Sequence, residues 1–267
     1  MQLRKAERRN AKIKLALTGS SGCGKTYSAL LLASGITNWK NIAVIDTENG
    51  SADLYAHLGD YSVLPLPIHK PDEYIKAIET CEKAGIEVII IDSITHEWQW
   101  CLEYHSKLPG NSFTNWGKIT PLHNRFLRKV LTSDVHIIAT MRTKQDYVLQ
   151  DKNGKKVPEK VGLKTVQRDG MDYEFTVVFD LDIKHNATAS KDRTSIFDKE
   201  TAFVITPETG KRISDWCKQG TTEKQVREMI EKANKIETLT AIWNKYPEFH
   251  KNLKQAFSKK RELIEAA

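Results

Sequence analysis

The sequence has few cysteines and no long apolar run. Its four cysteines, Cys23, Cys81, Cys101 and Cys217, lie far apart, with no CxxC pair and no Cys/His cluster in the sequence. This spacing argues against a disulfide framework and against a zinc site. No stretch reaches the roughly eighteen apolar residues of a membrane span, and no apolar signal core follows the basic start MQLRKAERRNAK. We therefore expect a soluble, intracellular protein with reduced thiols and no membrane partner.

The composition allows a large hydrophobic core and favours an anionic partner. The chain has 267 residues, of which 40% are hydrophobic, enough for one large α/β domain with or without an appendage. Lysine and arginine total 41 against 34 aspartates and glutamates, which gives a net charge of +7. A positive balance favours polyanions such as nucleic acids, although charge alone does not establish such a partner.

Short apolar runs alternate with helical patterns in the first half of the chain. We expect strands at 13–18, 42–46, 87–92 and 135–141, and helices at 25–35, 71–84, 93–107 and 117–132. The strands are apolar throughout, as in parallel strands that are covered on both faces. Alternation of this kind predicts a mostly parallel sheet flanked by helices.

The pattern changes after residue 142. The segment that follows is polar and rich in lysine, and its KNGK sequence predicts a hairpin turn. Residues 175–186 and 201–210 have strand-like patterns. Residues 222–265 show helical spacing, with apolar positions at Val226, Met229, Ile230 and Ala233 and again at Phe249, Leu253, Phe257 and Ile264. We expect a domain over 1–217 and a small helical appendage over 222–267.

A glycine-rich loop joins the first strand to the first helix. Its pattern is Gly19, four residues, Gly24, Lys25 and Thr26, which is the phosphate-binding loop of ATPases and GTPases. Backbone amides and the helix N-terminus attract phosphates, Lys25 reaches the β- and γ-phosphates, and the Thr26 hydroxyl binds Mg²⁺. The residues expected to contact ATP are Gly19, Ser20, Ser21, Gly22, Cys23, Gly24, Lys25, Thr26 and Tyr27.

Two carboxylates are expected at the same edge of the sheet. Asp92 ends an aliphatic strand and is the candidate second Mg²⁺ residue, which acts through water. The glutamate that often follows such an aspartate is replaced here by Ser93. Glu48 lies just past the tip of strand 42–46, and the carboxyl ends of parallel strands meet at one edge. Glu48 is therefore the candidate general base, although a solvated loop carboxylate would have the same pattern.

The sequences VIDTENGSADLYA and IIIDS, together with the phosphate loop, resemble the RecA-type recombinase core over roughly residues 13–215. They are most similar to the short phage-encoded RecA-like ATPases of single-strand annealing and recombination. The resemblance implies a RecA-like α/β P-loop core in the cytoplasm of a bacterium or a phage-infected cell. It assigns the catalytic base to Glu48. It also implies a nucleotide sensor after strand 135–141, where the usual amide is absent and Thr140 or Arg142 takes its place.

RecA-type proteins form rings or filaments in which a neighbouring subunit completes each ATP site. The resemblance suggests Lys191 or Arg193 for this role, in a polar turn between two strand-like runs. A cation there would neutralise charge on the γ-phosphate. A solvated basic turn would look the same in the sequence. The partners implied are further copies of the chain.

In the RecA core, two loops bind single-stranded DNA, and the matching segments here are 107–118 and 143–164. Lysines in such loops neutralise phosphates, and aromatic rings stack on bases. A solvated hairpin is the alternative. The candidate DNA-binding residues are Trp116, Tyr147, Lys152, Lys155, Lys156 and Lys160.

Three other functions fit parts of the sequence. The segment TKQD at 143–146 matches a guanine-recognition pattern, but Asp92 is not followed by the glycine that a GTPase needs at that strand. A helicase, helicase loader or other motor could use the same core. A nucleotide-gated DNA-binding switch that hydrolyses ATP poorly is the third alternative.

Overall fold

The computed structural model describes residues 8–152 and 155–265, with side chains described outside 145–162 and Glu248. Lys12–Trp216 form one compact unit. The second unit begins at Cys217, and the described residues before Lys12 also belong to it. Among the described residues, no helix is long and apolar enough to cross a membrane.

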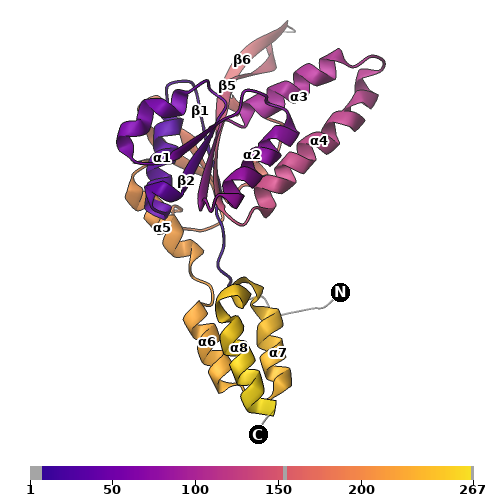
Figure 1. Ribbon diagram of the computed structural model, residues 1–267. Helices are drawn as coiled ribbons and strands as arrows, with labels where there is room; N and C mark the ends of the chain where they lie inside the picture. The colour runs from indigo at the N-terminus through magenta and orange to yellow at the C-terminus, as the bar shows by residue number, and fades with distance from the viewer. Residues whose placement is uncertain (1–7, 153–154, 266–267) are drawn as a thin grey trace. The chain divides into compact units, whose positions relative to one another are not determined.

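A mostly parallel sheet forms the centre of the larger unit (Figure 1). Its strands follow the order β3-β2-β4-β5-β1-β7-β8-β9, and β6 pairs with β5 outside this path. The first five strands of that order pair in parallel, β1 also pairs in parallel with β7, and β7, β8 and β9 are antiparallel. The bounds are β1 Lys14–Gly19, β2 Ile42–Asp46, β3 Ser62–Pro65, β4 Val88–Asp92, β5 His136–Lys152, β6 Lys155–Thr165, β7 Val177–Leu181, β8 Asn186–Asp192 and β9 Phe203–Val204.

Helices cover both faces of this sheet, which explains why its strands are apolar throughout. Ile89 and Ile91 of β4 pack in one core cluster with Tyr74 of α2 and Phe126 of α4. The helix α1 packs against β1, β4 and β5. The core helices are α1 Lys25–Ile36, α2 Pro71–Lys83, α3 Thr95–Lys107, α4 Ser112–Thr132 and α5 Pro207–Cys217, with short 3₁₀ turns at Trp39–Asn41, Ser51–Leu58 and Met171–Glu174.

The prediction of α/β architecture with a mostly parallel sheet is confirmed. Several elements differ from expectation, among them β8, which lies where a polar turn was expected, and α4, which begins earlier than residue 117. Strand β3 was not predicted. Residues 201–210 were expected to be strand-like, but only Phe203–Val204 are a strand, and Pro207 begins the helix α5.

The strand β5 has two parts with different partners. Ile137 to Arg142 pair with β1 inside the parallel sheet, and Ile137 to Ala139 also pair with β4 on the other side. From Thr143 onward the same strand pairs only with β6, in an antiparallel ribbon that leaves the sheet (Figure 1). The predicted hairpin is present, although its KNGK turn includes Asn153 and Gly154, which lie outside the described residues.

The second unit contains the helices α6 Glu223–Lys232, α7 Ile236–Lys245 and α8 His250–Glu265, with a 3₁₀ turn at Pro247–Phe249. Thr222 and Gln225 form a capping box at the start of α6. The core of this unit consists of Val226, Ile230, Ala233, Leu239, Tyr246, Leu253 and Phe257, with Phe249 and Ile264 packed against it. Met229 was expected on the apolar face, but it is exposed.

Candidate nucleotide site

The phosphate loop lies between β1 and α1, as expected. Gly22 and Gly24 have φ angles of 80° and 84°, a left-handed conformation that favours glycine. A Cβ atom on Gly24 would lie 2.9 Å from Nδ1 of His185, so the loop has no room for a side chain there. The ammonium of Lys25 donates to the carbonyl oxygens of Gly19 (3.0 Å) and Ser20 (2.7 Å). These bonds hold the cation over the loop.

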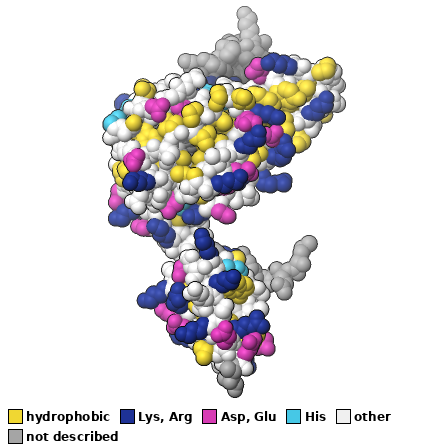
Figure 2. Space-filling model, viewed as in Figure 1, with side chains coloured by type: hydrophobic (Ala, Val, Ile, Leu, Met, Phe, Trp, Pro, Cys, Tyr) yellow, Lys and Arg dark blue, Asp and Glu magenta, His cyan; other side chains and the backbone are white. Residues whose placement is uncertain are grey.

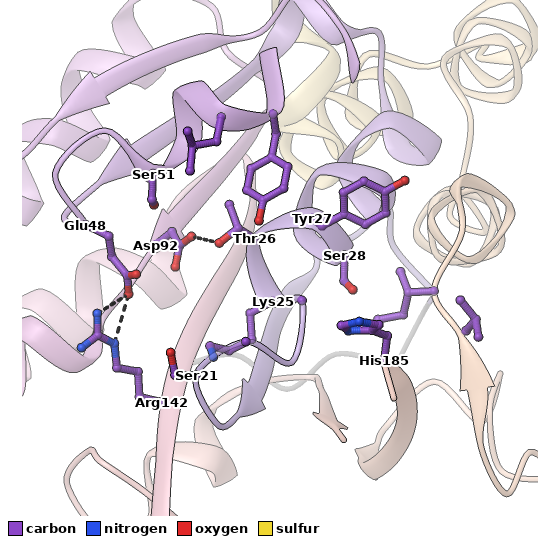
Figure 3. A pocket seen from close by; sticks show the side chains of 16 residues that line it. Ser21, Lys25, Thr26, Tyr27, Ser28, Glu48, Ser51, Asp92, Arg142 and His185 are labelled. Atoms are coloured by element: carbon purple, nitrogen blue, oxygen red, sulfur yellow. Dashed lines mark hydrogen bonds and ion pairs between the residues drawn. The ribbon is translucent and has the colours of Figure 1, made fainter. Parts of the chain in front are cut away.

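The side chains of Thr26 and Thr140 both contact Asp92 beside this lysine, and Figure 3 shows the contact between Thr26 and Asp92. The Thr26 hydroxyl donates to Oδ2 of Asp92 at 2.5 Å, and the Thr140 hydroxyl donates to Oδ1 at 2.5 Å. Burial raises the pKa of Asp92 because desolvation disfavours the carboxylate. A buried carboxylate next to a threonine hydroxyl is an oxygen ligand set of the kind that Mg²⁺ prefers. Thr26 and Asp92 therefore fit the metal role predicted for them.

Glu48 lies in the same pocket as Asp92, as expected from the parallel strands. Asp46 and Asp92 are partners in the β2–β4 register. The Thr47 amide donates to the Asp92 carbonyl at 2.8 Å, which ties the two strand tips together. The Asp46 carboxylate accepts the Glu48 amide at 2.6 Å and fixes the turn that carries this residue.

The carboxylate of Glu48 is bound by Arg142. Its Oε1 accepts from Nε of Arg142 at 3.1 Å and from a terminal guanidinium nitrogen at 2.8 Å (Figure 3). Thr140 and Arg142, the two candidates for the sensor, thus differ in position. Thr140 contacts Asp92, and Arg142 contacts Glu48.

The pocket is a cavity of about 570 Å³, a size typical of ligand sites. Its polar side includes Lys25, Thr26, Asp92, Glu48 and Arg142. Its other lining residues include Tyr27, Leu54, Tyr55, Val204 and Ile205. The rings of Tyr27 and Tyr55 lie 6.0 Å apart. Charged groups for phosphates and an apolar, aromatic wall for a base are thus present in one cavity.

The sequence analysis missed His185, a pocket residue that contacts the loop. Its Nδ1 lies 3.0 Å from the Cys23 carbonyl oxygen, and its φ angle is 67°. The Asp182 carboxylate accepts the amides of Lys184 (2.8 Å) and Asn186 (2.9 Å) and so shapes the β7–β8 turn. The D-x-x-x-N spacing was a signal for this turn, but nothing in the sequence indicated that the turn reaches the phosphate loop.

Lys191 and Arg193 do not lie in the polar turn predicted for them. Lys191 belongs to strand β8, opposite Val178, and Arg193 follows its end. Both side chains donate to the Tyr173 carbonyl oxygen, Arg193 at 3.3 Å. Neither is among the described residues that line the nucleotide pocket of their own chain. The turn between β7 and β8 is at 182–185.

The prediction that 107–118 is a loop is wrong for most of its length. The helix α4 already begins at Ser112, where the Asn111 side chain accepts the Phe113 amide at 2.8 Å as an N-cap. Trp116 is half-buried and stacks on His105 (4.2 Å between ring centroids) and Trp98 (5.8 Å). The ring therefore has packing partners within the protein and is not a free platform for bases.

The remaining DNA-binding candidates lie in the β5–β6 ribbon. The backbone register includes Tyr147, Lys152, Lys155, Lys156 and Lys160. Their side chains lie outside the described residues. The TKQD segment, expected as a possible guanine-recognition element, is part of strand β5, with Thr143 opposite Thr165 and Lys144 opposite Lys164. It therefore does not form a loop at the nucleotide pocket.

Comparison with known proteins agrees with this geometry. No curated protein matches the chain significantly. The family model for an AAA domain matches residues 11–205. This range includes the phosphate loop, Glu48, Asp92, Arg142 and His185. The match covers most of the chain, and the protein therefore belongs to this AAA domain family of P-loop ATPase-like proteins.

Proposed function

We propose that this protein is a Mg²⁺-dependent ATPase of RecA type that acts as an oligomer on single-stranded DNA, in recombination or strand annealing. One observation carries the ATPase part. The phosphate-loop cation, the metal-side carboxylate and a second carboxylate, Lys25, Asp92 and Glu48, line one cavity. A nucleoside triphosphate, a divalent ion and an attacking water need these three groups together.

Each residue has a defined task in this proposal. Loop amides and Lys25 bind the β- and γ-phosphates, and the tyrosine side of the cavity takes the base. Thr26 and Asp92 would hold Mg²⁺, which neutralises charge on the phosphates when bound. Glu48 orients the attacking water and accepts its proton. Arg142 donates both of its hydrogen bonds to Oε1, so the other carboxylate oxygen of Glu48 can take the proton, and the guanidinium stays close enough to bind an anionic group in the pocket.

The DNA part of the proposal is supported by the continuity of β5. Thr140 and Arg142 contact the two carboxylates of the site, and the same strand continues from Thr143 into the ribbon. The sequence places six lysines between 144 and 164 in this ribbon. The strand that carries Thr140 and Arg142 thus runs directly into a cationic hairpin, so a movement of these residues on nucleotide binding can reach the hairpin through the backbone. Lysines of this kind bind nucleic acid through its phosphates.

The experiment is an ATPase assay with and without single-stranded oligonucleotide. We expect Mg²⁺-dependent ATP hydrolysis that single strands stimulate. Lys25→Ala should abolish it and weaken nucleotide binding, because the pocket loses its phosphate-loop cation. Lys40→Ala removes an exposed lysine of the same unit and should leave hydrolysis unchanged. Turnover at the wild-type rate by Lys25→Ala would exclude this pocket as the site of ATP hydrolysis. Hydrolysis that is insensitive to DNA would exclude the coupling to single strands only.

A specific observation favours one alternative, a nucleotide-gated switch with slow hydrolysis. Glu48 is already occupied by two hydrogen bonds from Arg142. If this pair persists with ATP bound and holds the carboxylate away from the attacking water, hydrolysis is slow and nucleotide binding itself becomes the signal. In that case ATP would change the affinity for single strands while turnover stays negligible, with or without DNA.

A further inference from the structure

A buried cluster of three side chains lies between α3 and α4, outside the nucleotide pocket. Glu97 and Cys101 come from α3, and His123 comes from α4. All three are at most 1% exposed. Their candidate ligand atoms lie within 4.8 Å of one another, and within the described part of the chain no other group of this kind was found.

Helix periodicity explains how the cluster forms. Glu97 and Cys101 are four residues apart and therefore share one face of α3. The neighbouring helix α4 runs beside α3 (Figure 1) and supplies His123 to the same space. The edge of the His123 ring packs against Trp98, with 5.2 Å between centroids, which fixes its orientation. The three groups are thus held by helices and not by loops.

We propose that Glu97, Cys101 and His123 form a binding site for a divalent transition-metal ion of the zinc class. Carboxylate, thiolate and imidazole are all zinc ligands, and bond lengths of about 2.0–2.3 Å place two ligands of a tetrahedral ion roughly 3.3–3.6 Å apart. The Cys101 sulfur lies 3.3 Å from Oε1 of Glu97. His123 Nδ1 lies 3.2 Å and 3.1 Å from the two Glu97 oxygens. The two distances to Glu97 thus already match those of ligands on one ion, and the Cys101 sulfur and the His123 nitrogen lie within 4.8 Å of each other.

The charges of the cluster also suit such an ion. A fully buried carboxylate needs a counter-charge, and Glu97 has one weak thiol donor and one imidazole as neighbours. A divalent ion with one carboxylate, one thiolate and a neutral imidazole has no net charge. Binding therefore releases a proton, as is usual for thiolate sites.

A cavity of about 260 Å³ lies next to the cluster. Its lining includes His123, Arg168, Asp169 and Glu174. His123 is the ligand that the cluster and this cavity share. Three protein ligands leave one position of a tetrahedral ion for water.

This site differs from the Mg²⁺ position in ligand chemistry. Thr26 and Asp92 offer only oxygen, which suits Mg²⁺, whereas a sulfur and a nitrogen ligand favour zinc or cobalt. The two positions are nevertheless connected through the start of α3. Asp92 is only three residues before Thr95, and the Thr95 hydroxyl accepts the Arg142 amide at 2.9 Å. An ion between α3 and α4 would therefore stabilise the helix that begins at the nucleotide site.

The experiment is a Co²⁺ titration of the reduced full-length chain in excess Mg²⁺. We expect one Co²⁺ per chain, a visible tetrahedral spectrum and a near-ultraviolet sulfur-to-cobalt charge-transfer band that Zn²⁺ abolishes. Cys101→Ala should remove the band and weaken Co²⁺ binding by more than the roughly 10–100-fold typical of losing an outer partner. Cys81→Ala, which removes another buried helical thiol, should keep the band. Zn²⁺ should raise the melting temperature of the wild type and of Cys81→Ala, but not of Cys101→Ala.

Either of two results would overturn the proposal. The first is a wild-type chain that shows no sulfur-to-cobalt band, in which case the three side chains are a hydrogen-bonded core cluster only. The second is a band that survives in Cys101→Ala. The first result is measured on the wild-type chain, so the proposal can be tested even if Cys101→Ala fails to fold. His123→Gln, which keeps the size of the side chain, gives a second variant and should also weaken Co²⁺ binding.

Discussion

Glu48 is the proposed general base, and in the structure its carboxylate forms an ion pair with Arg142. Glu48→Gln keeps the shape of the side chain but cannot accept a proton. Loss of a positioned acid–base group typically costs roughly 10²–10⁴-fold in rate, so turnover should fall by about 10²-fold or more. ATP affinity should survive because Lys25 and Thr26 are untouched. Single-turnover hydrolysis and fluorescent-nucleotide binding measure the two quantities.

The matched control for this variant is Glu103→Gln, an exposed carboxylate of α3 paired with Lys107. It should hydrolyse ATP at the wild-type rate. Normal turnover by Glu48→Gln would place the base elsewhere and weaken the resemblance to RecA-type proteins. A loss of ATP binding in the same variant would instead indicate that the Glu48–Arg142 pair supports the pocket structurally.

Site residues that are close in sequence, or that follow the ends of predicted parallel strands, could be placed together from the sequence, whereas residues from other parts of the fold could not. Gly24, Lys25 and Thr26 follow one another, and their spacing alone defines a phosphate loop. His185 comes from a distant turn. The cluster of Glu97, Cys101 and His123 was not predicted either, because its residues meet only in the fold. Its three residues are separated by 3 and 21 others and lie on two helices, so they form no CxxC pair and no local Cys/His cluster in the sequence.

Two histidines near the pocket, His69 and His96, are expected to make the free energy of unfolding depend on pH. His96 Nδ1 lies 2.7 Å from the Thr47 hydroxyl, and its ring stacks on His69 at 4.9 Å. Burial lowers the pKa of both, and the Arg142 charge lowers that of His96 further. The unfolded chain, with a histidine pKa of about 6.5, therefore binds more protons than the folded one below that pH. Stability should be constant above about pH 6.5 and should fall as the pH decreases towards the folded pKa values.

Urea-unfolding midpoints between about pH 7.5 and pH 5 measure this effect. His96→Gln should flatten the decrease, because the variant has no buried imidazole at this position to be charged. His57→Gln removes an exposed histidine of the same unit and should leave the slope unchanged. An equal slope in all three proteins would assign the acid sensitivity to other groups.

At the scale of elements, the apolar strands β1, β2, β4 and the first part of β5 were predictable, whereas β3, β8 and the limits of some helices were not. The run before Asp92 is apolar and short, which is typical of a buried parallel strand. The start of α4 was missed because Gly117 and the polar residues around it weaken the helical pattern. The Asn111 cap and the stacking of Trp116 on α3 stabilise the helix there. Tertiary packing thus decided a boundary that local propensity left open.

The β5–β6 ribbon is the element on which DNA binding depends. Replacing Lys152, Lys155 and Lys156 together by alanine removes three charges near its tip. Because cationic contacts act mainly by releasing counterions, the salt dependence of binding should become shallower by about 0.7 per lost contact with a single strand. ATP binding should not change, because the phosphate loop belongs to other elements. Titration of a fluorescent oligonucleotide at several salt concentrations gives both the affinity and the slope.

Two variants make this prediction specific. Replacing Lys224, Lys232 and Lys235 by alanine removes the same net charge from exposed positions of the second unit and should leave the slope unchanged. Tyr147→Ala, if its ring stacks on a base, should cost about 1–3 kcal/mol without altering the slope. Unchanged affinity and slope in the triple ribbon variant would mean that the hairpin does not contact DNA.

At the scale of the whole molecule, the close packing of α1 and α5 requires glycines, and these glycines made α5 hard to predict from the sequence. Gly35 of α1 and Gly210 of α5 meet where the two helices touch, and a Cβ on Gly210 would lie 2.1 Å from the Leu32 carbonyl oxygen. Glycine weakens a helical pattern, and the start of α5 was therefore included in the strand-like segment 201–210. The grouping of the residues just before Lys12 also differs from the expected domain over 1–217. The Ala11 amide donates to the Cys217 carbonyl oxygen at 2.9 Å, and residues just before Lys12 belong to the unit that begins at Cys217.

Assembly is the last feature that the proposed function requires. Lys191 and Arg193 lie away from the nucleotide pocket of their own chain, so any part they take in hydrolysis must occur in a neighbouring copy. We therefore expect specific ATPase activity to rise with protein concentration. Lys25→Ala and Arg193→Ala should each be inactive alone. Mixed together, they should regain part of the activity, because some sites combine an intact Lys25 with an intact Arg193 from the other subunit. Mixing Lys25→Ala with Glu48→Gln should restore nothing, because both changes disable the same side of the site. Activity that does not depend on concentration, or full activity of Arg193→Ala alone, would exclude Arg193 from this role.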